Sequence, residues 1–299
     1  MDILPIEMIE EIVSRTSPLD VCGKLSIVSR SFWSAAKSDI TWERFLPADL
    51  ISRRAVSDQY LFKDPWKKID FDTMRAFPTK KDLYLFLSDN PLIIDDGVMY
   101  FWLDKFSGNK CFHISPKLIL NHQGIFDSEP SRFNDIPILE GKENLEISGK
   151  ISTSLLSSNA AYTAYLLFTF EDEFGGFGEE EPLETFVGID GGGCETENRI
   201  VYIPFLLSLF YHYKRAEYPK LRSQYPEFTG PQYPVRRADG WYEVELGDYF
   251  NKKGSDSREL KMSLREVKSG REKFGISLQG IEIRAMKKEK NSITRCSKL

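Results

Sequence analysis

The chain has 299 residues and a formal net charge of −5 at pH 7, with 41% hydrophobic and 28% charged residues. This composition is typical of a folded globular protein, and the length suffices for one large domain or two ordinary ones. The acidic balance argues against nucleic acid as the main partner. We expect no membrane span, because apolar runs such as Ile203–Phe210 are too short for a bilayer.

The cysteines are few and scattered, at Cys22, Cys111, Cys194 and Cys296. Without a Cys/His cluster, the sequence predicts neither a zinc site nor a disulfide framework, and we expect no cofactor. The N-terminus lacks the basic and long apolar regions of a secretion signal, and the chain contains no Asn-x-Ser/Thr sequon. These features predict a reducing, intracellular setting.

The first 46 residues predict three short amphipathic helices. Ser17 is a typical N-cap, and Pro18 is typical of the first helical position. The apolar stripes of the three helices are, in order, Ile6, Ile9, Ile12 and Val13; Val21, Leu25 and Val28; and Phe32, Trp33 and Ala36. Helices this short cannot bury so many large apolar groups among themselves, so a partner surface is expected.

The order of these residues resembles an F-box. The matching elements are Leu4-Pro5, Glu7, Ile9, Ile12, Asp20-Val21, Val28-Ser29-Arg30, Phe32-Trp33 and Trp42. Membership of that family implies docking on the Skp-type linker subunit of a cullin-containing SCF ubiquitin ligase. The docking residues that the resemblance implies are Leu4, Pro5, Ile9, Ile12, Leu25, Val28 and Trp33. The alternative is an ordinary helical subdomain whose stripes pack on the rest of the chain.

Residues 47–91 predict a partly helical connector, with a helix over Lys80–Leu87 that stops at Asn90-Pro91. From Ile93 onward the apolar period changes to about two. The predicted strands are Met99–Leu103, Lys110–Ile114, Leu145–Ile151, Thr163–Phe170, Phe186–Ile189, Ile200–Ile203, Trp241–Leu246, Leu260–Val267 and Ile276–Ile283. Many strands without long helices between them favour an α+β chain with an antiparallel sandwich or barrel.

Two segments interrupt the strand pattern. Glu171–Glu184 is acidic and contains a Gly-rich turn, so it is interpreted as a solvated hairpin loop. Phe205–Pro234 contains four prolines, which argue against a continuous strand and predict a long excursion from the sheet.

The C-terminal part resembles the phloem-lectin (Nictaba-type) domain from about Gly108 to Arg284. The resemblance rests on Gly108–Ile114, Leu145–Ile151 with Tyr162–Phe168, Asp239–Phe250, and Glu259–Lys268 with Gly275–Arg284. It implies a jelly-roll β-sandwich over residues 92–286 that binds N-acetylglucosamine (GlcNAc) oligomers or N-glycan cores. The expected architecture is therefore an N-terminal three-helix F-box at residues 1–46 followed by an antiparallel jelly-roll β-sandwich.

Three residues are candidates for glycan or client contact. The family carries two tryptophans after its first strand; here His122 stands where the first would be, and Phe126 is the candidate substitute for the second. Trp241 is the third candidate, because an aromatic face suits the apolar side of a pyranose. The alternative for Trp241 is that it covers the end of the sheet, with Glu243 and Glu245 on the same solvated strand face.

The tail at residues 287–299 is polar and basic, which predicts disorder. It ends in Ser297-Lys298-Leu299, which matches the peroxisomal address. The F-box resemblance favours the cytoplasm or the nucleus instead.

Together these patterns predict a non-catalytic substrate adaptor of an SCF-type ubiquitin ligase, whose β-domain binds a client protein or an N-glycosylated protein. The alternative is an intracellular lectin-like module for GlcNAc oligomers or N-glycan cores. A hydrolase is a third reading, but no Ser/His/Asp or metal constellation has credible spacing.

Overall fold

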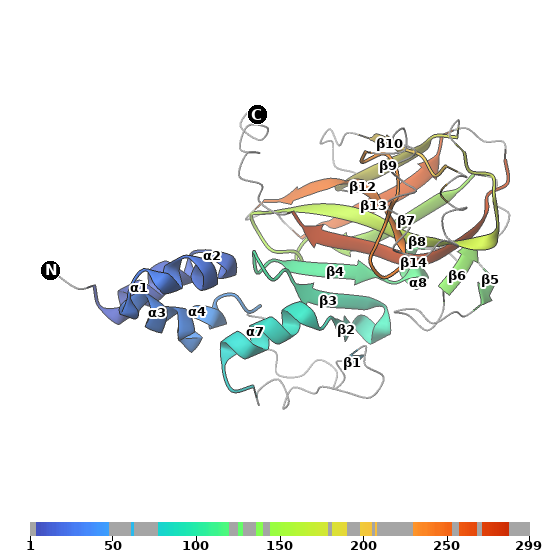
Figure 1. Ribbon diagram of the computed structural model, residues 1–299. Helices are drawn as coiled ribbons and strands as arrows, with labels where there is room; N and C mark the ends of the chain where they lie inside the picture. The colour runs from blue at the N-terminus through green and yellow to red at the C-terminus, as the bar shows by residue number, and fades with distance from the viewer. Residues whose placement is uncertain are drawn as a thin grey trace. The chain divides into compact units, whose positions relative to one another are not determined.

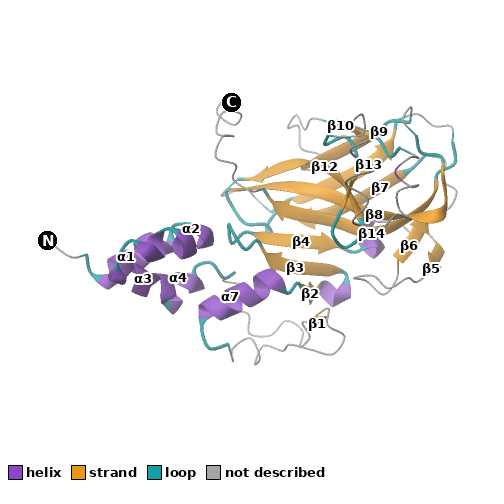
Figure 2. Ribbon diagram, in the orientation of Figure 1, coloured by secondary structure: helices purple, strands orange, loops and turns teal. Residues whose placement is uncertain are grey.

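The computed structural model describes residues 4–47, 61–62, 77–119, 125–127, 136–139, 144–178, 181–189, 198–204, 207, 230–252, 257–267 and 271–286 (Figure 1). The chain divides into two compact units. The first comprises residues 1–94, 100–111 and 285–299, and the second comprises residues 95–99 and 112–284. Helices predominate in the first unit and strands in the second (Figure 2).

The N-terminal helices begin at well-formed caps. The segments are α1 (Ile6–Ser14), α2 (Pro18–Gly23), the 3-10 helix η1 (Leu25–Ile27), α3 (Arg30–Lys37) and α4 (Asp39–Glu43). Ser17, Ser29 and Ser38 each accept a hydrogen bond from a backbone N–H of the helix that follows, which satisfies one otherwise unpaired donor. The expected three helices are thus four α-helices and one 3-10 helix: the second ends at Gly23, before Leu25 and Val28, and Trp42 lies on α4.

Trp42 is the centre of the first unit's packing. Its ring is fully buried, and its Nε1–H donates to the Ala36 carbonyl at 2.8 Å. The ring lies 5.2 Å, centroid to centroid, from Tyr84 of α7 (Lys80–Asp89), the helix predicted at Lys80–Leu87. Tyr84 donates in turn to the Asp104 carbonyl at 3.0 Å, and burial raises the pKa of its hydroxyl. These contacts fix α4 against α7.

The first unit also contains short strands. β1 (Leu61–Phe62) pairs with β2 (Leu92–Ile94), and β3 (Met99–Leu103) lies beside β2. A further 3-10 helix, η2 (Asp95–Gly97), separates β2 from β3.

The second unit is an antiparallel β-sandwich. Its larger sheet has the order β4-β14-β8-β12-β11, with β6 beside β14 and β5 beside β6; its smaller sheet has the order β10-β9-β13-β7. The larger sheet contains β4 (Lys110–Ile114), β5 (Ile125–Asp127), β6 (Ile136–Leu139), β8 (Ala160–Gly175), β11 (Val235–Arg236), β12 (Tyr242–Asn251) and β14 (Phe274–Ala285). The smaller contains β7 (Glu146–Ser152), β9 (Leu183–Ile189), β10 (Arg199–Val201) and β13 (Glu259–Glu266), and α8 (Pro116–Ile119) packs on β7.

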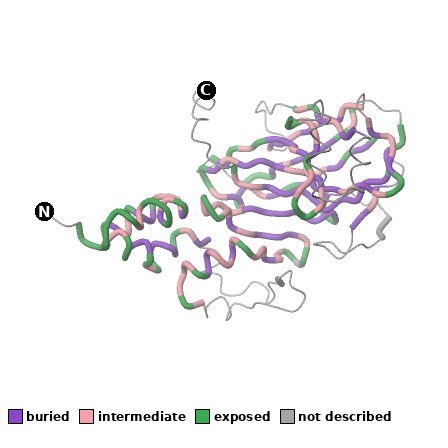
Figure 3. The backbone as a smooth tube through the Cα atoms, viewed as in Figure 1, coloured by how far each residue is buried: buried purple, intermediate pink, exposed green. Residues whose placement is uncertain are grey.

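The sandwich core follows the expected alternation of inward and outward side chains. On β12, Tyr242, Val244 and Leu246 are buried, whereas Glu243 and Glu245 are partly exposed. β12 contacts β9 and β13 of the smaller sheet, which places these buried side chains between the two sheets. Figure 3 shows the buried backbone concentrated along the central strands.

All nine predicted strands are present: Met99–Leu103 and Lys110–Ile114 have the predicted ends, and the other seven have shifted ends. The largest correction concerns Glu171–Glu184: β8 continues through Glu171 and Asp172 to Gly175, and β9 already begins at Leu183. The long β8 is favoured because Phe170 and Phe174 are buried and make a T-shaped ring contact at 4.8 Å. Most of the predicted excursion at 205–234 and the tail at 287–299 lie outside the described residues.

Candidate functional site

The N-terminal helices present several large apolar side chains to solvent. Of the predicted docking residues, Leu4, Pro5, Ile12, Val28 and Trp33 are exposed, with Val28 at 61% and Trp33 at 52% of their full accessibility. Leu25 is partly exposed. Ile6, Leu19 and Ile40 are also exposed, and we call six of the exposed apolar residues the N-terminal apolar set: Leu4, Met8, Ile12, Ile27, Val28 and Trp33. Such a density of exposed apolar side chains in one short segment is typical of an interaction surface.

Ile9 has a different role from the one that its place in the pattern implies. Its side chain is only 3% exposed, because α1 packs on α3 and α4 with Ile9 and Val13 inward. Ile9 therefore stabilises the helices that carry the N-terminal apolar set. Met8 and Ile27 belong to the set but were not predicted; their large apolar side chains next to the two stripes were the available signal.

Polar contacts hold these helices in place. Glu11 of α1 accepts from the guanidinium groups of Arg15 and Arg44, and the hydrogen bond from Arg15 is the main cause that lowers the pKa of Glu11. The Lys37 ammonium lies 3.6 Å from the centroid of the Trp33 ring, a cation–π contact that orients the ring.

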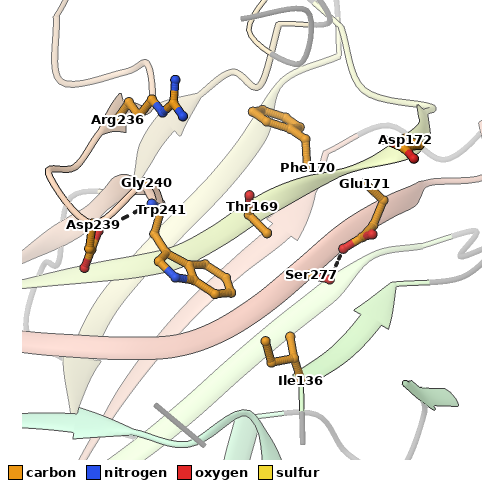
Figure 4. A pocket seen from close by; sticks show the side chains of 10 residues that line it. All are labelled: Ile136, Thr169, Phe170, Glu171, Asp172, Arg236, Asp239, Gly240, Trp241 and Ser277. Atoms are coloured by element: carbon orange, nitrogen blue, oxygen red, sulfur yellow. Dashed lines mark hydrogen bonds between the residues drawn. The ribbon is translucent and has the colours of Figure 1, made fainter. Parts of the chain in front are cut away.

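The second unit contains an open cavity of about 620 Å³ on its larger sheet (Figure 4). Its lining comes from β6, β8, β11, β14 and the turn between β11 and β12. The lining residues are Ile136, Thr169, Phe170, Glu171, Asp172, Arg236, Asp239, Gly240, Trp241 and Ser277. This volume lies within the usual range of ligand pockets.

The polar groups of the cavity are arranged at two ends. At one end Glu171 accepts a hydrogen bond from the Ser277 hydroxyl, and Asp172 is exposed beside it. At the other end lie Arg236 and Asp239, and Figure 4 shows the Trp241 ring between the two ends. Asp239 is 3.3 Å from the guanidinium of Arg237, which also pairs with Glu282 and Glu243.

A partly buried ionic network, in which Glu282 is buried, adjoins this cavity through Arg237. The Arg237 guanidinium lies 2.9 Å from Glu282 and 3.4 Å from Glu243, and Arg284 lies 2.8 Å from Glu243. Burial opposes the charge on Arg237, yet the Glu282 carboxylate leads the groups that raise the pKa of Arg237 overall. This network fixes β14 against β12 next to the cavity.

Comparisons with known proteins identify the family. The phloem protein 2 family profile matches residues 121–285. Three relatives from Arabidopsis thaliana match nearly the whole chain: F-box protein At2g02240 is 35% identical over 96% of this chain and 81% of its own length; F-box protein PP2-B10 is 33% identical over 96% and 94%; and F-box protein SKIP3 is 33% identical over 96% and 89%. The chain belongs to the F-box proteins of the phloem protein 2 family.

Both sequence resemblances are thereby confirmed at the level of the family. In this F-box/phloem protein 2 chain, the family profile begins within the strand-rich part, and the relatives extend the match over the N-terminal helices. Among solved structures, the CBM22-1 xylan-binding domain of Paenibacillus barcinonensis Xyn10C has a TM-score of 0.31 at 12% identity, covering 57% of this chain and 86% of that chain. A likeness at that level carries no argument.

Of the three candidate glycan contacts of this F-box/phloem protein 2 chain, the structure places only Trp241 in the cavity. Trp241 lines the cavity and is partly exposed. Phe126 lies on β5, in a strand whose side chains are not described, and His122 lies outside the described residues. The cavity's acidic residues Glu171 and Asp172 were missed because the segment was interpreted as a loop; the phenylalanines at 168, 170 and 174 were the signal for a continuing strand.

Two searches of the described residues gave negative results. In that part of the chain, no group of three or more His, Cys, Asp or Glu side chains is arranged to hold a metal ion. No helix there is long and apolar enough to cross a membrane.

Proposed function

We propose that this protein is a substrate-recognition adaptor of an SCF-type E3 ubiquitin ligase. In this role, residues 1–46 form the F-box and bind the Skp-type linker subunit, and the β-sandwich, with jelly-roll connections, binds a client. The observation that carries the proposal is the N-terminal apolar set on a chain whose relatives are F-box proteins. Burial of large apolar side chains is the usual driving force for such docking.

The adaptor does no chemistry itself. It raises the effective concentration of client lysines near the charged conjugating enzyme that the cullin scaffold carries, so that transfer becomes nearly intramolecular. The protein's contribution is therefore two binding surfaces held on one chain.

Co-purification with the linker subunit tests this role. The double variant Leu4→Ala with Pro5→Ala, and the double variant Val28→Ala with Trp33→Ala, should both abolish recovery of the linker. Phe250→Ala is the matched control, because Phe250 is an equally exposed large apolar residue that lies on β12. Unchanged recovery with both double variants would exclude the F-box role.

A second candidate function is glycan binding. The observation that favours it is Trp241 in a cavity that also contains the hydroxyls of Thr169 and Ser277, since sugar sites combine an aromatic face with polar groups. A glycan array probed with the full chain tests it. Specific binding of GlcNAc oligomers or N-glycan cores, lost in Trp241→Ala, supports the lectin role, and silence on the array excludes it.

The adaptor role places the protein in the cytoplasm or the nucleus, whereas Ser297-Lys298-Leu299 would direct it to peroxisomes. A fluorescent protein fused to the N-terminus, which leaves the last three residues free, distinguishes these locations. Peroxisomal fluorescence that is lost on deletion of the last three residues would show that the address is used.

A further inference from the structure

The cavity on the larger sheet combines an aromatic ring with unequal charge. Three carboxylates and one guanidinium line it: Glu171, Asp172, Asp239 and Arg236. Asp239 lies 3.3 Å from the Arg237 guanidinium, whereas no ammonium or guanidinium among the described residues pairs with Glu171 or Asp172, so the Glu171–Asp172 end is the more acidic one. A cationic group that enters the cavity is attracted to that end.

The two acidic side chains differ in how they are held. Ser277 is 4% exposed, and its hydroxyl donates a hydrogen bond to Glu171. This buried partner fixes the direction of the Glu171 carboxylate. Asp172 makes no hydrogen bond or ion pair with any residue that the structure describes, and it is exposed at the rim. The Glu171 carboxylate is thus pre-oriented, whereas the Asp172 side chain leaves the opposite face of β8 and adds negative charge at the rim of the cavity.

Trp241 supplies the third element of the site. Its indole is partly exposed, and within the described ranges it makes no ring stacking or cation–π contact. An ammonium or guanidinium within about 6 Å of a Trp centroid gains cation–π attraction, and the methylene stem of Lys or Arg packs on the ring. A ring and two carboxylates around one cavity therefore match the chemistry of a basic side chain.

We propose that the cavity binds a lysine or arginine side chain of an extended basic segment of the client. This inference rests on the proposed adaptor function, because it assigns the client's recognition feature to this cavity. Trp241 contacts the methylene stem and the cation, Glu171 accepts its N–H groups, and Asp172 adds negative charge at the rim. The chain's overall charge of −5 favours approach of a basic segment.

Peptide binding to the full chain, purified from cells that also express the linker subunit, tests the assignment. The probes are a fluorescein-labelled Ser-Gly-Arg-Lys-Gly-Ser peptide and a matched peptide with glutamine in place of both basic residues. The basic peptide should bind at least about tenfold more tightly, and its affinity should fall as salt is raised from 50 to 300 mM because the attraction is partly electrostatic.

The variants locate the binding. The double variant Glu171→Gln with Asp172→Asn removes two charges and keeps the side-chain shapes, and Trp241→Leu removes the ring. Each change should lower the affinity for the basic peptide about tenfold. Trp241→Phe should restore most of the affinity lost in Trp241→Leu. Glu146→Gln is the matched control, because Glu146 is an exposed carboxylate on β7, outside the cavity lining. A thermal melt of each variant verifies folding.

The outcomes separate the site from the adaptor role. Equal binding of the two peptides, no binding of either, or no effect of the cavity variants would overturn the assignment. Chitotriose that binds in the cavity, with loss in Trp241→Leu but not in the charge variant, would also overturn it in favour of a glycan. Recovery of the linker subunit from the same preparations tests the adaptor role separately. Peptide binding without linker recovery would overturn the adaptor role but would still support the cation site.

Discussion

The carboxylate of Glu282 lies 2.9 Å from the guanidinium of Arg237, and the Glu282 side chain is only 2% exposed. His113, with a fully buried ring, approaches the same carboxylate at 3.5 Å through Nδ1, and its Nε2 lies 2.9 Å from the Gln279 carbonyl oxygen. A buried carboxylate in an ion pair is costly to leave without its partner. The interior of the larger sheet therefore depends on Arg237.

Arg237→Ala should lower the free energy of unfolding by about 3 kcal/mol, because it removes the nearest cation from a buried carboxylate. Arg265→Ala is the matched control: Arg265 pairs with Glu184 on the smaller sheet, but its side chain is 59% exposed, so the loss should stay below about 1 kcal/mol. Urea denaturation measures both. Equal losses would show that burial does not determine the strength of the Arg237 pair.

Gly275 and Gly97 provide a second matched pair. Both have positive φ, +76° and +89°, but a Cβ on Gly275 would lie 1.8 Å from the Glu173 carbonyl oxygen, whereas a Cβ on Gly97 would meet nothing within 4 Å. Gly97→Ala should cost only the left-handed backbone strain, about 1 kcal/mol. Gly275→Ala should cost about 3 kcal/mol or more, because β14 must move away from β8.

Soluble yield and thermal unfolding distinguish the two glycine variants. A Gly275→Ala protein as stable as Gly97→Ala would mean that β8 and β14 do not approach closely at Glu173.

Glu245 predicts a pH dependence of stability. Burial raises the pKa of Glu245 above the ordinary glutamate value, although Arg199 beside it acts in the opposite direction. Between the unfolded and the folded pKa, the native state holds more protons than the unfolded state, so stability falls as pH rises through that window. The window begins near pH 4.3, the usual pKa of an unfolded glutamate.

Comparison with Glu245→Gln isolates this effect, since glutamine cannot ionise. The free energy of unfolding of the wild type minus that of the variant should decline as pH rises from about 4 through the folded pKa, and should level off above it. Urea melts at half-unit intervals of pH measure the difference. A difference that increases with pH would mean that the Arg199 pair outweighs burial.

The sequence predicted the elements whose signals are local. The alternation at Trp241–Leu246 predicted β12, and Ser17 and Pro18 predicted the start of α2. Three features escaped prediction because they depend on contacts between segments far apart in the sequence. Ile9 is buried only because α3 and α4 pack on α1, and the cavity exists only because β8, β14 and the β11–β12 turn meet.

The third feature is the extent of β8. From its acidic residues alone, the end of β8 was predicted to be a solvated turn. In the structure, Ser277 on β14 donates a hydrogen bond to Glu171, and Phe174 packs on Phe170. Strand pairing across the sheet thus overrides the local preference of charged residues for a loop. The acidic end of the cavity lies in the segment that was wrongly predicted to be a hairpin loop.

Trp33 and Trp42 should separate binding from stability in the N-terminal helices. Trp42 is fully buried, donates to Ala36 and lies against Tyr84, so Trp42→Ala should cost about 3–5 kcal/mol and should also abolish recovery of the linker subunit. Trp33 is half exposed and contacts Lys37, so Trp33→Ala should cost less than about 1 kcal/mol while it weakens linker binding. Thermal unfolding and linker affinity, measured on the same two preparations, give the comparison. A Trp33→Ala protein that binds the linker normally would remove Trp33 from the docking surface, and a stable Trp42→Ala protein would mean that the helices are not built around that ring.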